Sequence, residues 1–360
     1  MSLASSQEII NQDIDEIIQA VGGGYFQPLA GTDMLITGPQ GLLGGYIVDT
    51  IARLNETVLR NSPCRVIGLS RSPVTTTSRL GHLLNKEHFT FHQHEVSRAY
   101  PFNDGFSPDF IIHAAGRSAP SIFTLDPIGT IDVNVSALRW LLDMAAQRKT
   151  QSFSFFSSSE VYGNPPPQWI PTPETYHGNS DSLGARGAYT EAKRCGEAMC
   201  LAFHITHAVP VKIFRPALIY GPGLPVDDKR VISDFINQGV KGQSIQLRDD
   251  GLARRCYCYI KDAMIVFWKA FLSDRNGEVF NIGGIPTMET TIKDLAILVQ
   301  SICGMEAEPR GGTLPSLAGS PDRVCVDMEK VRKTFGYLPE TPLADGLRAT
   351  IAWVKERSRG

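Results

Sequence analysis

The sequence contains no long apolar run and no marked excess of charge of either sign. No uninterrupted apolar window reaches about 18 residues, the length that a membrane-spanning helix needs, so we expect no membrane partner. The 35 lysines and arginines nearly balance the 37 aspartates and glutamates, and the formal charge of −2 argues against attraction of the whole surface to nucleic acid. A local basic pocket stays possible, because net charge does not describe how charges are distributed.

The cysteines and the N-terminal residues indicate which compartment to expect. The seven cysteines are odd in number and scattered, and none has the spacing of a zinc site. The N-terminal residues carry acids where a secretory signal carries Lys or Arg. We therefore expect reduced thiols, no bound metal and a cytoplasmic protein.

The chain of 360 residues, 42% of them hydrophobic, is long enough for one large or two modest domains. Residues 1–30 are interpreted as an N-terminal helical extension, whose amphipathic helix over 5–22 either packs on the main body or binds a partner. Short apolar runs then alternate with helical stretches over 31–220, which predicts an α/β protein with a doubly wound parallel sheet. Residues 221–360 have a looser pattern and predict a smaller C-terminal α/β lobe, with a chain segment that crosses back to the larger one.

Periodicity and turn residues also predict where the single elements lie. We expect strands over residues 33–37, 65–69, 89–95, 110–113, 152–157 and 211–214. We expect helices over residues 44–54, 128–147, 188–203, 231–239, 262–271, 292–303 and 343–356.

The first motif is a set of glycines spaced GxxGxxG directly after the first expected strand. Gly38 permits a tight turn, Gly41 lets the backbone approach a pyrophosphate, and Gly44 allows close packing of helix on sheet. The N–H groups at the start of the following helix favour the phosphate charge. Residues 31–220 are therefore predicted to form an NAD(P)-binding domain that also carries the catalytic residues.

The end of the second expected strand bears on which dinucleotide binds. An NAD site usually has an acid there that holds the ribose 2′-hydroxyl, but this strand ends in Ser70-Arg71. Arg71 is suited to a 2′-phosphate, with Ser70 as a further donor, so the sequence favours NADP. An NAD site that lacks the acid, with Arg71 as a solvated loop residue, is the alternative.

The second motif places Tyr189 four residues before Lys193, so that the two side chains share one helix face. A free phenol is a weak base at neutral pH, and a nearby ammonium is expected to lower its pKa. Ser158 follows an expected strand about thirty residues earlier. Since ligands bind at the carboxyl edge of such sheets, its hydroxyl is placed to hydrogen-bond the oxygen that loses a proton to Tyr189.

Together these motifs resemble the extended short-chain dehydrogenases/reductases. GxxGxxG, His113-Ala114-Ala115-Gly116, Ser157–Gly163 (SSSEVYG) and YxxxK occur in the order typical of the NAD-dependent epimerase/dehydratase family of nucleotide-sugar enzymes. The resemblance extends over roughly residues 33–356. It implies a Rossmann fold, a nucleotide-diphosphate sugar as substrate and a homodimer.

The resemblance also implies roles for individual positions. The catalytic residues would be Ser158, Glu160, Tyr189 and Lys193. The cofactor would be bound by Gly38, Gln40, Gly41, Leu42, Gly44, Ser70, Arg71, Glu95, Val96, Ala114, Ala115, Gly116, Asn134, Tyr189, Lys193 and Pro216. The substrate would be bound by Ser118, Ser159, Arg186, Arg215, Arg255 and Arg323. Arginine forks pair well with phosphate oxygens, although a solvated arginine on the small lobe is the alternative for Arg255 and Arg323.

The family reactions share an oxidation at C4 of the sugar and then diverge into epimerisation, dehydration or decarboxylation. Glu160 follows Ser158 by two residues and is placed to take the C5 proton, which favours a lyase over an epimerase. A loop carboxylate that caps a helix is its other interpretation. The sequence around Tyr189 is closest to UDP-glucuronate decarboxylases, but Arg215-Pro216 replaces their Asn-Thr. Ser159 stands where dTDP-glucose dehydratases have Asp, whereas GDP-mannose dehydratases have Ser. An epimerase and an NADPH-dependent carbonyl reductase remain alternatives.

Overall fold

The computed structural model describes residues 5–102, 106–116, 119–225, 228–305, 309–312 and 320–358. Its centre is a seven-stranded sheet in the order β10-β6-β5-β4-β1-β2-β3, and every pair of neighbouring strands is parallel. The strands are β1 (Asp33–Thr37), β2 (Arg65–Ser70), β3 (Phe89–Gln93), β4 (Phe110–His113), β5 (Ser152–Phe156), β6 (Val211–Pro216) and β10 (Glu278–Ile282). The predicted doubly wound parallel sheet is confirmed.

The strand order reverses between β1 and β4. From β1 the chain proceeds outward through β2 and β3, whereas β4, β5 and β6 follow in the opposite direction. The loops that leave β1 and β4 therefore part from one another at the carboxyl edge of the sheet. This topological switch point is where open α/β sheets bind their ligands.

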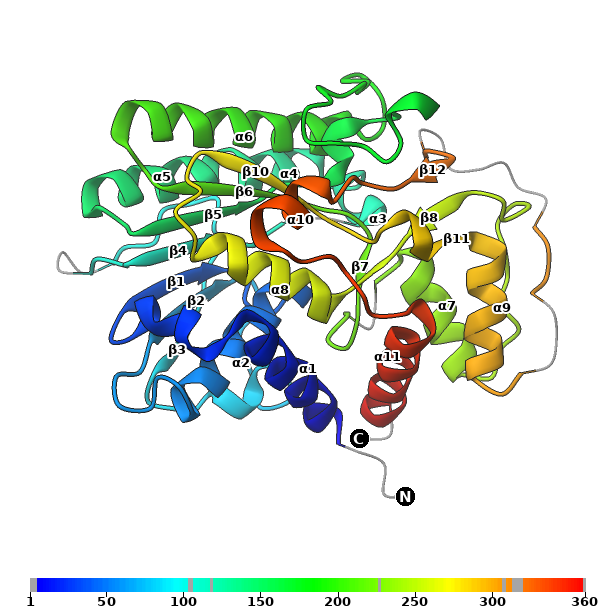
Figure 1. Ribbon diagram of the computed structural model, residues 1–360, viewed down its shortest axis with the longest axis horizontal. Helices are drawn as coiled ribbons and strands as arrows, with labels where there is room; N and C mark the ends of the chain where they lie inside the picture. The colour runs from blue at the N-terminus through cyan, green and yellow to red at the C-terminus, as the bar shows by residue number, and fades with distance from the viewer. Residues whose placement is uncertain are drawn as a thin grey trace.

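Helices cover both faces of the sheet. Figure 1 shows α4 (Pro127–Asn134), α5 (Ser136–Arg148) and α6 (Gly187–His207) on one face, with α1 (Ser6–Val21), α2 (Leu42–Glu56) and α8 (Ile260–Phe271) on the other. Two buried apolar clusters fill the two interfaces. One includes Leu138, Leu142 and Phe203, and the other includes Ile47, Ile51 and Phe267. None of the described helices is both long and apolar enough to cross a membrane.

The single helix expected over residues 128–147 is wrong in one respect, because Val135 divides it into α4 and α5. The carbonyl of Val133 accepts a hydrogen bond from the ring nitrogen Nε2 of His113 at 2.9 Å. That carbonyl is thereby drawn to the end of β4 at the point where the helix changes direction. Burial lowers the pKa of His113 to about 3, so the ring is neutral and joins strand to helix as a structural group.

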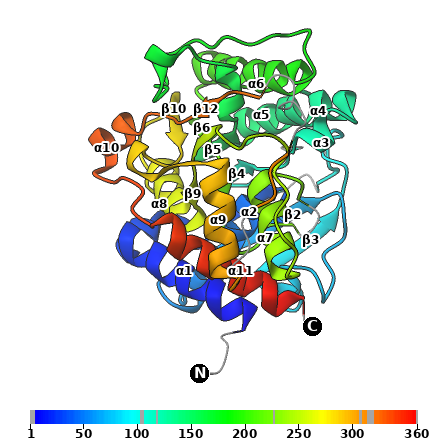
Figure 2. The ribbon, with the colours of Figure 1, turned by 90° about the vertical axis from the view of Figure 1, so that its right-hand side faces the viewer.

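The second lobe lies beside the carboxyl edge of the sheet. Figure 2 shows α7 (Val231–Val240), α9 (Ile292–Ile302) and α11 (Leu343–Arg357) packed together there. A three-stranded sheet is formed by β11 (Glu289–Thr291), β8 (Arg254–Cys256) and β12 (Arg323–Val324), while β7 (Ile219–Tyr220) pairs with β9 (Cys258–Tyr259). Between these elements, α8 and β10 return to the main sheet, and α10 (Glu329–Phe335) packs on both. The domain boundaries at residues 30 and 220 stay predictions.

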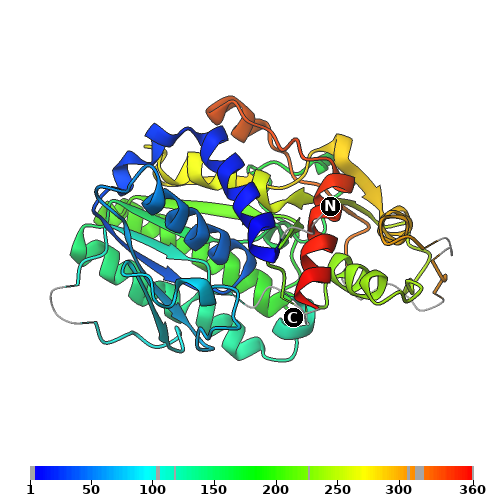
Figure 3. The same cartoon turned by 90° about the horizontal axis from the view of Figure 1, so that it is seen from below.

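The N-terminal helix α1 packs on the body of the protein, as its apolar periodicity indicated. Ser5 and Glu8 form a capping box at its start, and the Ser5 hydroxyl accepts the Glu8 N–H. Its buried residues Ile10, Ile14 and Ile17 face α2, α8 and α11. Figure 3 shows α1 crossing over these elements from below. Over its described residues, this helix therefore has no free apolar face, which the partner-binding interpretation would require.

Asp13 of α1 is buried between the two lobes. Its Oδ2 accepts hydrogen bonds from the Tyr46 hydroxyl of α2 at 2.7 Å and from the Tyr259 hydroxyl of β9 at 2.8 Å. Glu16 and Lys261 form an ion pair at 2.6 Å nearby. Burial raises the pKa of Asp13 from 3.8 to about 6, although the two phenols and Lys261 oppose the rise.

We expect the stability of the Asp13→Asn variant, measured as its free energy of unfolding, to rise relative to that of wild type as the pH rises. A folded-state pKa above the unfolded value means that the folded protein holds the proton more tightly, so stability falls as pH rises between those values. The free energy of unfolding of the variant minus that of wild type should increase by about 2 kcal/mol between about pH 4 and about pH 7. Chemical unfolding at several pH values measures this difference. A flat Asp13→Asn difference would contradict the prediction.

Candidate active site

The glycine motif forms a turn between β1 and α2. Gly38 has a φ of +71°, and a Cβ added to it would lie 2.7 Å from the Cα of Ala115. A Cβ on Gly44 would lie 2.3 Å from the Gly38 carbonyl oxygen. The fold itself therefore requires these two glycines, one for the approach of the β4 loop and one for the approach of the helix to the turn.

Gly41 has a different reason to be glycine. A Cβ there would meet only the Gly38 oxygen, at an ordinary 3.5 Å, so packing within the protein does not exclude a side chain. Gly41 is the residue that precedes α2, and no side chain caps this helix. The first N–H groups of α2 thus face a backbone surface without a side chain. This cradle fits a pyrophosphate, and a dinucleotide cofactor matches the residues present.

A pocket opens over this turn at the switch point of the sheet. It is lined by Gly38, Gln40, Gly41, Leu69, Ser70, Arg71, Ser72, His94, Glu95, Val96, Ala115, Gly116 and Val133. Nine of the sixteen residues predicted to bind the cofactor are in this lining, and seven are outside it: Leu42, Gly44, Ala114, Asn134, Tyr189, Lys193 and Pro216. Asn134 is fully buried and donates to the Thr130 carbonyl, so its predicted contact with a cofactor is not supported by its position.

The rim of this pocket at the end of β2 carries an exposed cation. The Gln40 side-chain amide donates to the Ser70 hydroxyl at 3.2 Å and to the Ser72 carbonyl at 2.8 Å, which holds the loop in place. The Ser70 hydroxyl donates to the Ser72 carbonyl at 2.7 Å. Within the described residues, the Arg71 guanidinium has no hydrogen-bond or ion-pair partner, and it is exposed.

Three of the four predicted catalytic side chains converge beside the pocket. The phenol of Tyr189 hydrogen-bonds with the hydroxyl of Ser158, which joins α6 to the end of β5. The Lys193 ammonium donates to the Phe156 carbonyl at 2.5 Å and lies 5.8 Å from the centre of the Tyr189 ring. A Cβ on Gly116, a pocket residue, would lie 3.9 Å from Lys193 Nζ. Side chains from motifs that are far apart in the sequence therefore lie together, next to the predicted cofactor pocket.

The electrostatics of this group differ from the expectation of a lowered phenol pKa. Burial raises the pKa of Tyr189 to about 12, although its hydrogen bond with Ser158 opposes the rise. Burial also lowers the pKa of Lys193 to about 7, because an ammonium is costly to desolvate. In the protein alone, desolvation is therefore the largest cause of both pKa shifts. A bound cationic ring would add a positive charge that favours the phenolate.

Glu160 lies beside this constellation in a two-point ion pair. Its carboxylate accepts hydrogen bonds from Arg186 Nε at 2.8 Å and from Arg186 Nη2 at 2.6 Å. Both side chains are partly exposed, and Arg186 immediately precedes α6, three residues before Tyr189. The capping interpretation of Glu160 is not what the structure shows, because it is the Ser158 hydroxyl that caps the short 3-10 turn Ser159–Tyr162.

Arg255 of β8 brings a second guanidinium toward Glu160. It donates to the carbonyls of Arg254, Pro321 and Asp322, and in the described part of the chain no carboxylate pairs with it. Burial lowers its pKa, and the charges of Glu160 and Arg186 both act on it. The site therefore holds two guanidinium groups around a single carboxylate, which suits an anionic ligand.

The other predicted substrate residues are placed less favourably. Arg215 is held by Glu197 at 2.8 and 2.6 Å and donates to the Tyr162 hydroxyl, so its fork is occupied inside the protein. Arg323 donates to Glu289 at 2.5 Å on the small sheet. Ser159 is half-buried at the start of its turn, and Ser118 lies outside the described residues. The assignment of Arg215 to the substrate is therefore opposed by its geometry.

Two side chains near Tyr189 carry no motif and were not predicted from the sequence. Arg230, held by Asp228 at 2.8 and 2.6 Å just before α7, acts electrostatically on both Tyr189 and Tyr257. Phe123, at the end of α3 (Pro120–Phe123), stacks on Tyr189 with ring centres 4.7 Å apart. Only the Pro/Gly-rich character of the loop before Arg230 marks it in the sequence, and nothing marks Phe123.

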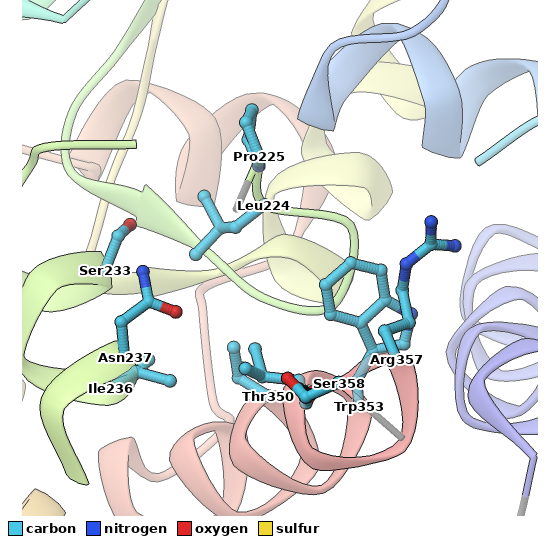
Figure 4. A pocket seen from close by; sticks show the side chains of 10 residues that line it. Leu224, Pro225, Ser233, Ile236, Asn237, Thr350, Trp353, Arg357 and Ser358 are labelled. Atoms are coloured by element: carbon cyan, nitrogen blue, oxygen red, sulfur yellow. Dashed lines mark hydrogen bonds between the residues drawn. The ribbon is translucent and has the colours of Figure 1, made fainter. Parts of the chain in front are cut away.

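A second cavity lies between α7 and α11, away from this constellation. Figure 4 shows Thr350 and Trp353 of α11 facing Ser233 and Ile236 of α7, with Leu224 above them. Its lining is mainly apolar and includes none of Ser158, Glu160, Tyr189 and Lys193. The candidate active site is therefore the carboxyl edge of the main sheet.

The chain resembles known proteins over most of its length. A model of the NAD dependent epimerase/dehydratase family matches residues 34–283. UDP-glucuronic acid decarboxylase 5 of Arabidopsis thaliana is 28% identical over 87% of this chain and 86% of its own length. UDP-glucuronic acid decarboxylase 1 of Xenopus tropicalis is 27% identical over 90% of this chain and 72% of its own.

Solved structures share the fold. UDP-glucose 4-epimerase from Thermotoga maritima, solved with UDP-glucose, superposes with a TM-score of 0.76 at 23% identity, over 90% of this chain and 99% of that one. A dTDP-glucose 4,6-dehydratase from Streptomyces venezuelae, solved with NAD, gives a TM-score of 0.77 at 22% identity, over 90% and 97% of the two chains. At these identities the likeness establishes the fold alone.

Proposed function

Because the chain belongs to the NAD dependent epimerase/dehydratase family, we propose that it is an NAD(P)-dependent lyase acting on a nucleotide-diphosphate sugar through a transient 4-keto sugar. Within this class we favour decarboxylation of a sugar with a C6 carboxylate over 4,6-dehydration. The observation that carries the proposal is the phenol of Tyr189 bonded to Ser158, with the Glu160–Arg186 pair and Arg255 beside it. The names of the curated relatives support the same choice.

The chain's own residues divide the chemistry between them. A nicotinamide cofactor, when bound, would take up the hydrogen of C4 and later return it. Tyr189 would accept the proton of the C4 hydroxyl, which Ser158 holds in line, and Lys193 would supply the positive charge that favours the phenolate. The resulting 4-keto group weakens the bond to the C6 carboxylate. As that bond breaks, carbon dioxide leaves and its electron pair forms an enolate over C4 and C5, which takes a proton at C5.

Arg255 favours a substrate with a carboxylate. The fork of Arg186 is occupied by Glu160, whereas Arg255 has no ion-pair partner in the described part of the chain. A uronic acid adds one negative charge to the diphosphate, whereas a neutral hexose adds none. The Arg255 cation therefore suits the uronic acid better. Glu160 is the group placed to move a proton at C5.

The experiment that tests the function incubates the protein with UDP-, GDP-, dTDP- and CDP-sugars, UDP-glucuronate among them, and determines product masses. Loss of the mass of carbon dioxide is expected, while loss of the mass of water would indicate a dehydratase. An inverted sugar of unchanged mass would indicate the epimerase that the resemblance to solved epimerases keeps as the second candidate. Net oxidation of NADPH by small ketones, without reaction of any nucleotide sugar, would overturn the proposal in favour of a carbonyl reductase.

We also propose that the cofactor is NADP, although the similar solved structures that name a cofactor contain NAD. The exposed, unpaired guanidinium of Arg71 at the pocket rim supports it. We expect Arg71→Ala to raise the Kd of NADP by about tenfold or more, the usual value of a charged hydrogen bond, and to leave that of NAD unchanged. Fluorescence titration measures both. Arg60→Ala, at an exposed arginine outside the pocket, is the control, and equal effects on NAD and NADP would contradict the preference.

We propose further that the protein forms a homodimer through α3 and α4. Ile122, Leu125, Ile128 and Ile131 expose 45%, 85%, 72% and 42% of their surface there, and α4 packs beside α6. Such a row of apolar side chains is typical of an interface. Ile128→Asp is expected to yield monomers, as measured by light scattering, without lowering the melting temperature of the monomer. A monomeric wild type would contradict the proposal. The cytoplasmic location stays a prediction.

A further inference from the structure

The ring of Phe123 contacts two side chains of the candidate active site, Tyr189 and Arg186. Its ring stacks on that of Tyr189, with ring centres 4.7 Å apart and planes inclined by 10°. The Arg186 guanidinium carbon lies 5.5 Å from the centre of the Phe123 ring. Arg186 in turn holds both oxygens of Glu160. One apolar ring therefore contacts both the phenol that would accept the C4 proton and the cation that orients the carboxylate.

The surroundings of Phe123 make it a rigid contact. The residue is 1% exposed, and its backbone N–H donates to the Ala119 carbonyl at 3.1 Å. The next turn is held by Asp126, whose carboxylate caps the N–H of Gly129 in α4 at 2.9 Å. The ring thus belongs to a well-bonded turn that follows the Ala115–Gly116 loop of the cofactor pocket. The ring of Phe123 extends from the cofactor side of the site onto α6.

We propose that Phe123 is a positioning residue for the proton transfer, which holds the plane of the Tyr189 ring so that its hydroxyl meets Ser158 and the sugar, and which keeps water away from that hydroxyl. This inference rests on the proposed role of Tyr189. The physical reason lies in the rotational freedom of a phenol. A tyrosine ring turns about two side-chain bonds, and only neighbours that pack on its faces restrict it.

The stacked ring also affects the acidity of the phenol. Burial is the largest cause of the raised pKa of Tyr189, and a ring in face-to-face contact covers much of that phenol's surface. Removing the ring would admit water and bring the pKa back toward its ordinary value near 10. A residue that merely filled space elsewhere in the core would not change the ionisation of Tyr189.

The test compares Phe123→Leu, Phe123→Ala and Phe123→Tyr. We expect kcat to fall by about tenfold in the leucine variant and about a hundredfold in the alanine variant, with KM for the nucleotide sugar changed by less than about threefold. Phe123→Tyr keeps the ring and should restore most of kcat. Phe203→Leu is the matched control, because Phe203 is also buried, lies on α6 and contacts a guanidinium, that of Arg139 at 5.4 Å. It should lose stability without loss of kcat.

A measurement without turnover separates positioning from simple loss of structure. With ring-labelled tyrosine, the carbon resonance of Tyr189, identified by its loss in Tyr189→Phe, reports ionisation of the phenol in the ligand-free protein. At about pH 10 it should stay protonated in wild type and in Phe203→Leu, and be partly ionised in Phe123→Ala. The inference would be overturned if the ionisation of Tyr189 in Phe123→Ala and the kcat of Phe123→Leu were both the same as in wild type. Activity of Tyr189→Phe itself would instead overturn the proposed function.

Discussion

Tyr189→Phe is expected to lower kcat by about a thousandfold or more while leaving cofactor binding nearly intact, since proton transfer by a positioned side chain contributes on this scale. The phenol hydroxyl has one side-chain hydrogen bond, to Ser158. Its removal leaves the stacked ring and the buried volume unchanged. The variant should therefore keep the fold of the site and lose only the proton acceptor.

Initial rates with the active nucleotide sugar, Kd values for the dinucleotide and thermal unfolding curves check this result together. Tyr337→Phe is the matched control, because its hydroxyl also makes a side-chain hydrogen bond, to Asp262 at 2.6 Å, but in the segment that follows α10, away from the site. That variant should keep its kcat and lose some stability. A Tyr189→Phe protein with the kcat of wild type would remove Tyr189 from the mechanism, and loss of cofactor binding would give the phenol a binding role instead.

Glu160→Gln is expected to slow the entry of a solvent hydrogen at C5 by about a hundredfold or more, while oxidation at C4 persists. Glutamine keeps the shape of the side chain, and one oxygen still accepts from Arg186. It has no carboxylate to take or return a proton. The two steps should therefore separate, with reduced nicotinamide accumulating by its near-ultraviolet absorbance and no deuterium entering C5 from heavy water.

A carboxylate outside the site provides the comparison. Glu191 is also on α6 and pairs with an arginine, Arg194 at 3.5 Å, but it accepts from Ser180 and does not contact Tyr189 or Ser158. Glu191→Gln should take up a solvent hydrogen at C5 at the wild-type rate. Deuterium entering C5 at the native rate in Glu160→Gln would show that another group delivers the C5 proton, and that Glu160 acts only by holding Arg186.

Much of the fold was predictable because its signals are local. The strand over Asp33–Thr37 and its following glycines need only alternation and turn chemistry, which neighbouring residues provide. The expected convergence of Ser158, Tyr189 and Lys193 required one more rule, that parallel strands present their carboxyl ends at one edge. The break at Val135 was missed, because nothing in the neighbouring sequence marks it; close to it, the Val133 carbonyl accepts a hydrogen bond from His113 of β4, twenty residues away along the chain.

The arginines show where prediction from sequence ended. All four described arginines assigned to the substrate carry the same fork, and spacing does not reveal which forks are already occupied. Arg215 is taken by Glu197, eighteen residues earlier, whereas Arg255 donates to backbone carbonyls and the Ser320 hydroxyl and has no carboxylate partner in the described part of the chain. Pairing between such groups depends on which helix face meets which strand end.

By itself the sequence determined the layered parallel architecture, the phosphate-binding turn at Gly38–Gly44 and the presence of a phenol and an ammonium one helical turn apart, because each follows from residues within a few positions of one another. The tertiary structure alone decided that Glu160 is held by Arg186, that Phe123 packs on Tyr189 and that burial raises rather than lowers the pKa of that phenol. These depend on distances between remote segments and on the exclusion of water, and both arise only when the chain has packed.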